Sequence, residues 1–97
     1  MLDFYFIKDE QTKPEYPEIA NLEFGIGLNY DTFEKYIQKS IIDSRFDYYS
    51  DFRWSLKLIE QILARINKNK IDSNFYDLKP VLERALELKC GLIAYCD

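Results

Sequence analysis

The segment from Ser50 to Asn69 constrains the fold more than any other part of this chain, because it holds the longest regular hydrophobic period. At about 100° per residue, its large apolar side chains fall within an arc of roughly 160°: Phe52, Leu56, Leu58, Ile59, Ile62, Leu63 and Ile66. An apolar arc this wide contacts more than one neighbouring element. The pattern predicts a central helix over residues 51–68, capped at its start by Ser50 or Asp51.

Two further helices are predicted, one on each side of this segment. Residues 31–42 form the first, with Asn29 or Asp31 as its cap and an apolar stripe made of Phe33, Tyr36, Ile37 and Ile41. Residues 77–89 form the other, with Asp77 as its cap. Gly91 follows that helix and is expected to end it in a left-handed conformation.

Three segments have the patterns of strands. Residues 2–7 are apolar or aromatic at nearly every position, as in a strand covered on both faces. Residues 21–28 alternate, so that Phe24 and Ile26 are expected on the same face, and the glycines between them indicate a bulge or a close neighbour. Residues 92–96 are short and apolar.

These segments predict an α+β fold in a single domain spanning residues 1–97. We expect a three-stranded sheet, with strands 2–7, 21–28 and 92–96, packed on one face by the three helices in the order ββαααβ. The closing strand is expected to pair with the first, which would bring the two ends of the chain together.

The chain contains no histidine, and this absence excludes whole classes of site. Serine–histidine and cysteine–histidine nucleophile pairs, histidine metal sites and the usual proton shuttle near neutral pH are all removed. Cys90 and Cys96 match no metal or redox spacing and are expected to be reduced thiols in a cytoplasmic protein. We therefore predict a protein that is not an enzyme and that binds no metal or cofactor.

The glycines at positions 25 and 27 suggest a phosphate-binding loop, but the rest of the dinucleotide motif is missing. Tyr30 stands where the third glycine would be, and no Gly-Lys-Ser/Thr sequence is present. Nucleotide binding at this turn is therefore not expected.

The net charge of −4 is unevenly distributed. Residues 1–34 hold two lysines and eight acidic residues, a net charge of −6, whereas the remaining residues carry +2. Such a field opposes binding to a nucleic-acid backbone and favours encounter with a basic protein. The basic residues Arg65, Lys68 and Lys70 suit the end of the central helix.

No apolar run is long enough to span a membrane. The N-terminus reads as a strand and not as a secretion signal.

Residues 43–54 have the composition of a binding surface, because tyrosine, tryptophan and arginine dominate the energetics of protein interfaces. The predicted partner-binding residues here are Asp43, Asp47, Tyr48, Tyr49, Asp51, Arg53 and Trp54. The three aspartates recur every four residues and would line one face of a continuous helix. Trp54 lies at the border of the apolar arc and is expected to be half exposed.

An alternative interpretation of this segment stays open. The segment could be a corner between helices, with Phe46, Tyr49 and Phe52 filling the core and the arginines neutralising the aspartates. In the binding interpretation, acidic residues of the preceding loop also contact the partner: Asp9, Glu10, Glu15 and Glu18.

In size, charge and interface composition the whole chain resembles the small acidic immunity proteins of contact-dependent growth inhibition and related bacterial toxin systems. The features behind this resemblance are the strand LDFYFIKDEQ, the acidic loop to Glu18, the stretch 43–54 and the closing GLIAYCD. The resemblance implies a stoichiometric binder that covers the active site or substrate groove of a toxin, often a nuclease, with acidic groups in place of substrate phosphates. The alternative is a structural or regulatory subunit of a permanent oligomer, such as a homodimer.

Overall fold

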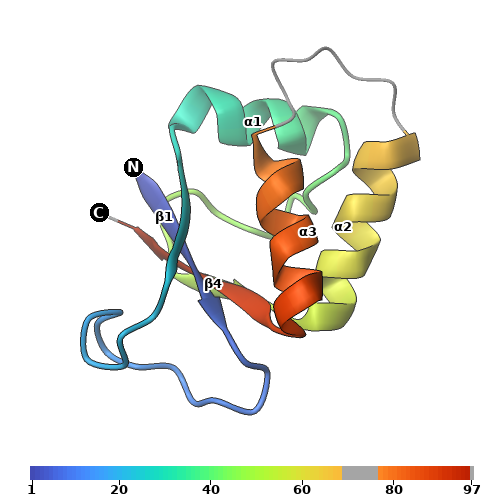
Figure 1. The fold of residues 1–97 in the computed structure, drawn as a ribbon. Helices are drawn as coiled ribbons and strands as arrows, with labels where there is room; N and C mark the ends of the chain where they lie inside the picture. The colour runs from blue at the N-terminus through green and yellow to red at the C-terminus, as the bar shows by residue number, and fades with distance from the viewer. Residues whose placement is uncertain (69–76, 97) are drawn as a thin grey trace.

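A computed structural model describes residues 1–68 and 77–96, so that Lys70 lies outside the described residues. The elements follow the order ββαβααβ: β1 (Leu2–Ile7), β2 (Phe24–Leu28), α1 (Tyr30–Gln38), β3 (Phe52–Trp54), α2 (Leu56–Lys68), α3 (Leu78–Leu88) and β4 (Gly91–Cys96). The strands form one antiparallel sheet in the order β2-β1-β4-β3 (Figure 1). Within the described residues, no helix has the length and apolar character needed to cross a membrane.

The prediction of a three-stranded sheet in the order ββαααβ is wrong, because a short fourth strand precedes α2. β3 pairs with β4 along its whole length, from Phe52 opposite Ala94 to Trp54 opposite Leu92. Phe52 also fits the apolar arc of a helix. The hydrophobic period therefore predicted this strand as the first turn of the helix that follows it. The helix begins at Leu56 and not at residue 51.

The start of α2 is stabilised by residues that the hydrophobic period did not indicate. The Ser55 hydroxyl accepts a hydrogen bond from the Leu58 amide at 3.2 Å. The Asp9 carboxylate accepts from the Leu56 amide at 3.1 and 3.2 Å, although the two residues are 47 positions apart. These bonds satisfy amides that have no partner within the helix. Neither Ser50 nor Asp51, the predicted caps, has this role.

The end of α1 differs from the prediction, whereas its start is confirmed. Asn29 caps the helix by accepting a hydrogen bond from the Thr32 amide at 2.8 Å. The helix ends at Gln38, and Ser40 then adopts a left-handed conformation with φ 58°. Ile41 and Ile42 are fully buried, but they reach the core from this turn and not from a helix that extends to residue 42.

The bounds of α3 agree with prediction to within one residue at each end, but its terminal residues have other roles. Lys89, with φ 54°, adopts the left-handed conformation that was expected at Gly91. Asp77 makes no side-chain capping bond. Gly91 instead opens β4, where an added Cβ would collide with the carbonyl oxygen of Trp54. The glycine is needed for the close approach of β3 and β4.

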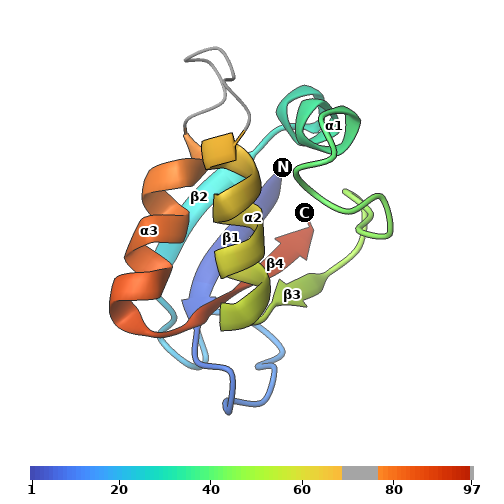
Figure 2. The same cartoon turned by 90° about the vertical axis from the view of Figure 1, so that its right-hand side faces the viewer.

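The helices α2 and α3 lie side by side on one face of the sheet, and α1 crosses the end of this layer (Figure 2). β4 pairs with β1 from Leu2 opposite Cys96 to Ile7 opposite Gly91. This pairing confirms that the closing strand lies beside the first and brings the two ends of the chain together.

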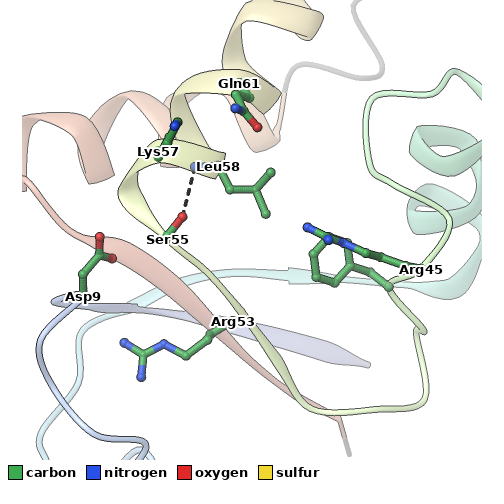
Figure 3. Close-up of a pocket in the computed structure, with 8 residues that line it drawn as sticks. Asp9, Arg45, Arg53, Ser55, Lys57, Leu58 and Gln61 are labelled. Carbon is green, nitrogen blue, oxygen red and sulfur yellow. Dashed lines mark hydrogen bonds between the residues drawn. The ribbon is translucent and has the colours of Figure 1, made fainter.

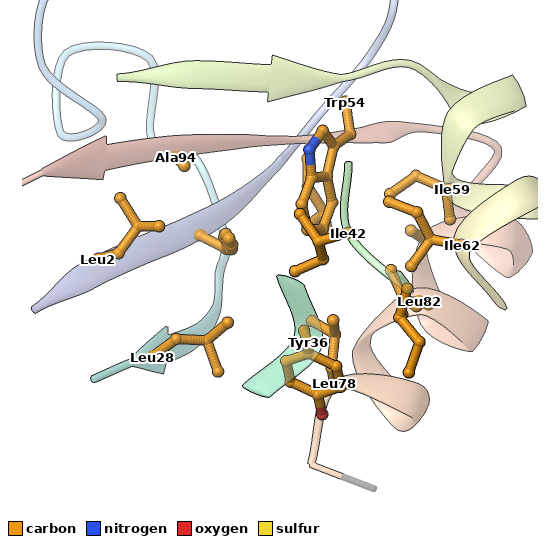
Figure 4. Close-up of a cluster of buried hydrophobic side chains, with 14 of the residues drawn as sticks. Leu2, Leu28, Tyr36, Ile42, Trp54, Ile59, Ile62, Leu78, Leu82 and Ala94 are labelled. Atoms are coloured by element: carbon orange, nitrogen blue, oxygen red, sulfur yellow. The ribbon is translucent and has the colours of Figure 1, made fainter. Parts of the chain in front are cut away.

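Trp54 lies in the centre of the core and is 1% exposed (Figure 4). Its ring lies 5.0 Å from that of Phe4 and 6.0 Å from that of Phe46. The prediction of a half-exposed Trp54 is therefore wrong. In a strand, Phe52 and Trp54 share one face and Arg53 takes the other, and the shared face here is the one that packs under the helices.

A bulge in β2 changes the face on which Phe24 lies. The register with β1 shifts between Phe4, which pairs with Ile26, and Tyr5, which pairs with Phe24. The extra residue is Gly25, where an added Cβ would lie 3.2 Å from the Phe4 carbonyl oxygen. Phe24 therefore packs on Tyr5, with ring centroids 5.5 Å apart, and is 54% exposed. The bulge was anticipated, but the strict alternation of residues 21–28 was wrong.

The loop between β1 and β2 covers part of the other face of the sheet. The guanidinium of Arg53 donates to the carbonyl oxygens of Gln11 at 2.8 Å and Lys8 at 3.0 Å. The Tyr95 hydroxyl donates to the carbonyl oxygen of Pro14 at 2.8 Å. Strand residues that point away from the helices therefore hold this loop in place.

Candidate partner-binding surface

Residues 43–50 form two consecutive turns, and each begins with an aspartate. The Phe46 amide donates to the Asp43 carbonyl oxygen, and the Ser50 amide donates to the Asp47 carbonyl oxygen, both at 3.1 Å. In each turn the aspartate carboxylate accepts a bond from the amide two residues later, from Arg45 at 2.9 Å and from Tyr49 at 3.0 Å. Aspartate favours the first position of a turn for this reason. The four-residue spacing therefore reflects the turns and not one face of a helix.

The second turn places Tyr48 and Tyr49 against Tyr30, the first residue of α1. The ring centroids of Tyr30 lie 5.5 Å from Tyr48 and 6.0 Å from Tyr49, and those of Tyr48 and Tyr49 lie 5.1 Å apart. Tyr49 is 69% exposed and Tyr30 is 45% exposed. Tyr48 is half-buried and contacts the core residue Phe33. We call these three residues the tyrosine cluster, which is anchored to the core on one side and open on the other.

Carboxylates surround the tyrosine cluster. Glu34 contributes most to raising the pKa of Tyr30, and Asp31 adds to the effect. Partial burial raises the pKa of Tyr48, an effect that the nearby backbone of Leu2 partly opposes. The raised pKa values keep the hydroxyls of Tyr30 and Tyr48 protonated at neutral pH.

A shallow hollow of about 340 Å³ lies beside the cluster. It is lined by residues from the exposed side of α1: Tyr30, Asp31, Glu34, Lys35 and Gln38. Two carboxylates against one ammonium group give this surface a negative charge, which suits a cationic side chain of a partner.

Other residues predicted to bind a partner make contacts within the fold. Asp51 bonds the Cys96 amide at 2.9 Å and pairs with Lys13 at 3.2 Å. Arg53 holds the loop between β1 and β2, Asp9 bonds the start of α2, and Trp54 is buried in the core. A side chain as deeply buried as Trp54 offers no surface to a partner. In the alternative interpretation, aromatic side chains of residues 43–54 fill the core at a corner between helices. Phe46 and Phe52 do pack against the core, but Tyr49 is exposed.

Glu10, Glu15 and Glu18 are exposed in the loop between β1 and β2. This loop lies at the end of the molecule away from α1 (Figures 1 and 2). The fold therefore separates these loop acids from the tyrosine cluster, although both were expected to contact the same partner.

Tyr30 belongs to the cluster but was absent from the predicted site. In the sequence, Tyr30 stood out only as the residue that replaces the third glycine of the dinucleotide motif. An available signal was an aromatic residue directly after the Asn29 cap, followed by Asp31 and Glu34 in the same helical turn. Nothing local linked it to Tyr48, because that contact depends on how the turns pack against α1.

Comparisons of the chain with protein-family models, with curated proteins and with solved structures find no match. The assignment of a function therefore depends on the chemistry of the surface described above.

Proposed function

We propose that this protein is a non-catalytic binding module that covers a basic surface of a protein partner with its tyrosine cluster. The observation that supports this function is a group of three tyrosine rings in mutual contact beside carboxylates, with Tyr30 and Tyr49 stacked and exposed and Tyr48 edge-on to both. Tyrosine combines a large apolar area with a directed hydroxyl, and it loses little conformational entropy when it binds. Exposed aromatic groups of this kind are typical of an interface.

The more specific proposal is an immunity protein that neutralises a toxin. In this function Asp31, Glu34 and Asp47 would face lysines and arginines that bind phosphates in the toxin, as a nuclease groove does. The exposed loop acids Glu10, Glu15 and Glu18, in the strongly acidic first third of the chain, would steer the encounter. The proposal rests on the acidic setting of the cluster and on the charge distribution of the chain.

The decisive experiment uses the toxin domain expected from the gene immediately upstream, purified and titrated against this protein. Replacing Tyr30 or Tyr49 by alanine should weaken binding by about tenfold or more in each case, because the loss of an anchor residue costs about 2 kcal/mol and about 1.4 kcal/mol is tenfold. Charge reversal of Asp31 and Glu34 should slow association and reduce the dependence of binding on salt.

The matched control is Tyr16→Ala. Tyr16 is also an exposed tyrosine, 56% exposed, but it lies in the loop between β1 and β2. Its loss should leave the affinity unchanged. Equal affinity of the Tyr30, Tyr49 and Tyr16 variants would exclude the tyrosine cluster as the interface. Failure of the wild-type protein to bind the toxin domain or to protect cells from it would exclude the immunity function.

A second candidate function is a subunit of a permanent oligomer, in which another copy of this chain covers the tyrosine cluster. The stacked and exposed rings of Tyr30 and Tyr49 favour it, since they offer the same apolar area to any partner. Sedimentation at micromolar concentration separates the two functions. A tight homodimer that Tyr49→Ala dissociates supports the second, whereas a monomer excludes it.

A further inference from the structure

A concave surface with a net positive charge lies between β3 and the start of α2. Its charge is opposite to that of the hollow beside the tyrosine cluster. It has a volume of about 540 Å³, within the range of small-ligand sites. We call it the basic concavity, and its lining residues are Asp9, Arg45, Phe46, Arg53, Ser55, Lys57, Leu58 and Gln61 (Figure 3). The tyrosine cluster contributes none of these residues.

Positively charged groups outnumber negatively charged groups in the lining of the basic concavity. Arg45, Arg53 and Lys57 supply three positive charges, and Asp9 supplies the one negative charge of the lining. Both oxygens of that carboxylate accept hydrogen bonds from the Leu56 amide. The lining thus carries a net charge of +2 on a protein whose net charge is −4. A hollow lined by one sign of charge concentrates counter-ions of the other sign.

Two of the cations are held in place by neutral groups. Arg53 donates to the carbonyl oxygens of Gln11 and Lys8, which fix the guanidinium without cancelling its charge. The guanidinium carbon of Arg45 lies 4.8 Å from the ring centroid of Phe46, a cation–π contact that also leaves the charge intact. These contacts restrict the guanidinium groups of Arg53 and Arg45, which lowers the entropic cost of binding a ligand, whereas Lys57 is exposed.

We propose that the basic concavity binds an oxyanion, the carboxylate or phosphate group of a small ligand. The guanidinium of Arg45 has paired N–H donors that match the geometry of both oxyanions, and Arg53 adds positive charge although both of its terminal nitrogens already donate to carbonyl oxygens. The apolar walls of Phe46 and Leu58 lower the local dielectric and strengthen the attraction. This site shares no residue with the tyrosine cluster. A failure of the oxyanion proposal would therefore leave the proposed partner-binding function unaffected, and the reverse also holds.

The test is a titration of the full chain with sodium phosphate and, separately, with sodium acetate, followed by amide chemical shifts in NMR. Ionic strength is held constant with sodium chloride. Saturable shifts are expected at Arg45, Ser55 and Lys57. Arg45→Ala and Lys57→Ala should each weaken binding by about fivefold, the loss of one charge-assisted contact at a partly exposed site.

The matched control is Lys39→Ala, which removes one positive charge at the exposed end of α1. This variant should bind phosphate and acetate as the wild-type protein does. Saturation by phosphate alone or by acetate alone supports the site and identifies the oxyanion. Shifts that never saturate, or an equal loss in the Lys39 variant, would overturn the proposal, because either result indicates a general charge effect.

Discussion

At the scale of the residue, Asp51 shows how a carboxylate expected to meet a partner can be used within the fold. Its oxygens contact the Cys96 amide at the end of β4 and the Lys13 ammonium in the loop between β1 and β2. Asp51 therefore connects three parts of the chain that are distant in sequence. The hydrogen bond from Cys96, followed by that from Lys13, lowers the pKa of Asp51.

This lowered pKa predicts how Asp51 affects stability in acid. A carboxylate whose pKa is lower in the folded than in the unfolded chain stabilises the fold above the unfolded value, near 3.9. That stabilisation is lost as the pH falls through the folded pKa. The variant Asp51→Asn should therefore lose stability less steeply than the wild-type protein between about pH 5 and 2, as measured by urea unfolding at each pH.

The control is Glu60→Gln, which removes one exposed acid from α2. The difference between the pH dependence of the two variants isolates the contribution of the bonds that Asp51 makes to Cys96 and Lys13. If the free energy of unfolding of the Asp51 variant fell with pH as steeply as that of the wild-type protein, the bonds to Cys96 and Lys13 would contribute nothing to stability in acid.

At the scale of the element, the approach of β3 to β4 depends on a residue with no side chain. The Trp54 carbonyl oxygen occupies the space that a Cβ at Gly91 would need, and the Asp9 carboxylate lies 3.1 Å from the same position. The first residue of β4 thus sets the path of β3 into α2. The three-residue strand holds Trp54 in the core on one face and Arg53 against the loop on the other.

Gly91→Ala is expected to destabilise the protein by about 1–3 kcal/mol, because the new methyl group meets backbone that cannot yield without moving a strand. The measurement is the free energy of unfolding in urea. Gly27→Ala is the matched control, since its methyl group would meet the flexible tips of Met1 and Asp3. A loss at position 91 no larger than at position 27 would contradict the requirement for glycine.

At the scale of the whole molecule, the sheet has two central strands that hold the two ends of the chain. β1 and β4 pair with each other and each also pairs with an edge strand, whereas β2 and β3 lie at the edges. Central strands open only when the whole fold opens, while edge strands open locally. The stability of the molecule is therefore concentrated in the first and last strands of the chain.

Amide hydrogen exchange followed by NMR measures this difference. Exchange should be slowest at the centres of β1 and β4, for example at Phe4 and Ala94, and faster in β3 and at the bulge of β2. Fast exchange at Phe4 and Ala94, or slow exchange throughout β3, would contradict the observed order of strands.

Local patterns in the sequence determined much of this fold. They identified the α+β class, the strands β1 and β4, the core face of α2, the bounds of α3 to within one residue, and Asn29 as one of two candidate caps of α1. Each of these features is encoded within a few neighbouring residues, by hydrophobic period or by capping chemistry. The four-residue recurrence of Asp43, Asp47 and Asp51 was also recognised, although turns that begin at Asp43 and Asp47, and not a helix, account for it.

Only the tertiary structure decided the features that join distant parts of the chain. The pairing of β3 with β4, the bond from Asp9 to α2, and the meeting of Tyr30 with Tyr48 and Tyr49 are of this kind. A strand of three residues is too short to show a period, and a capping carboxylate 47 residues away leaves no local signal. Local sequence therefore specified the three helices and the strands β1 and β4, whereas the packing of the elements decided the strand β3, the face of Phe24 and which exposed side chains share a surface.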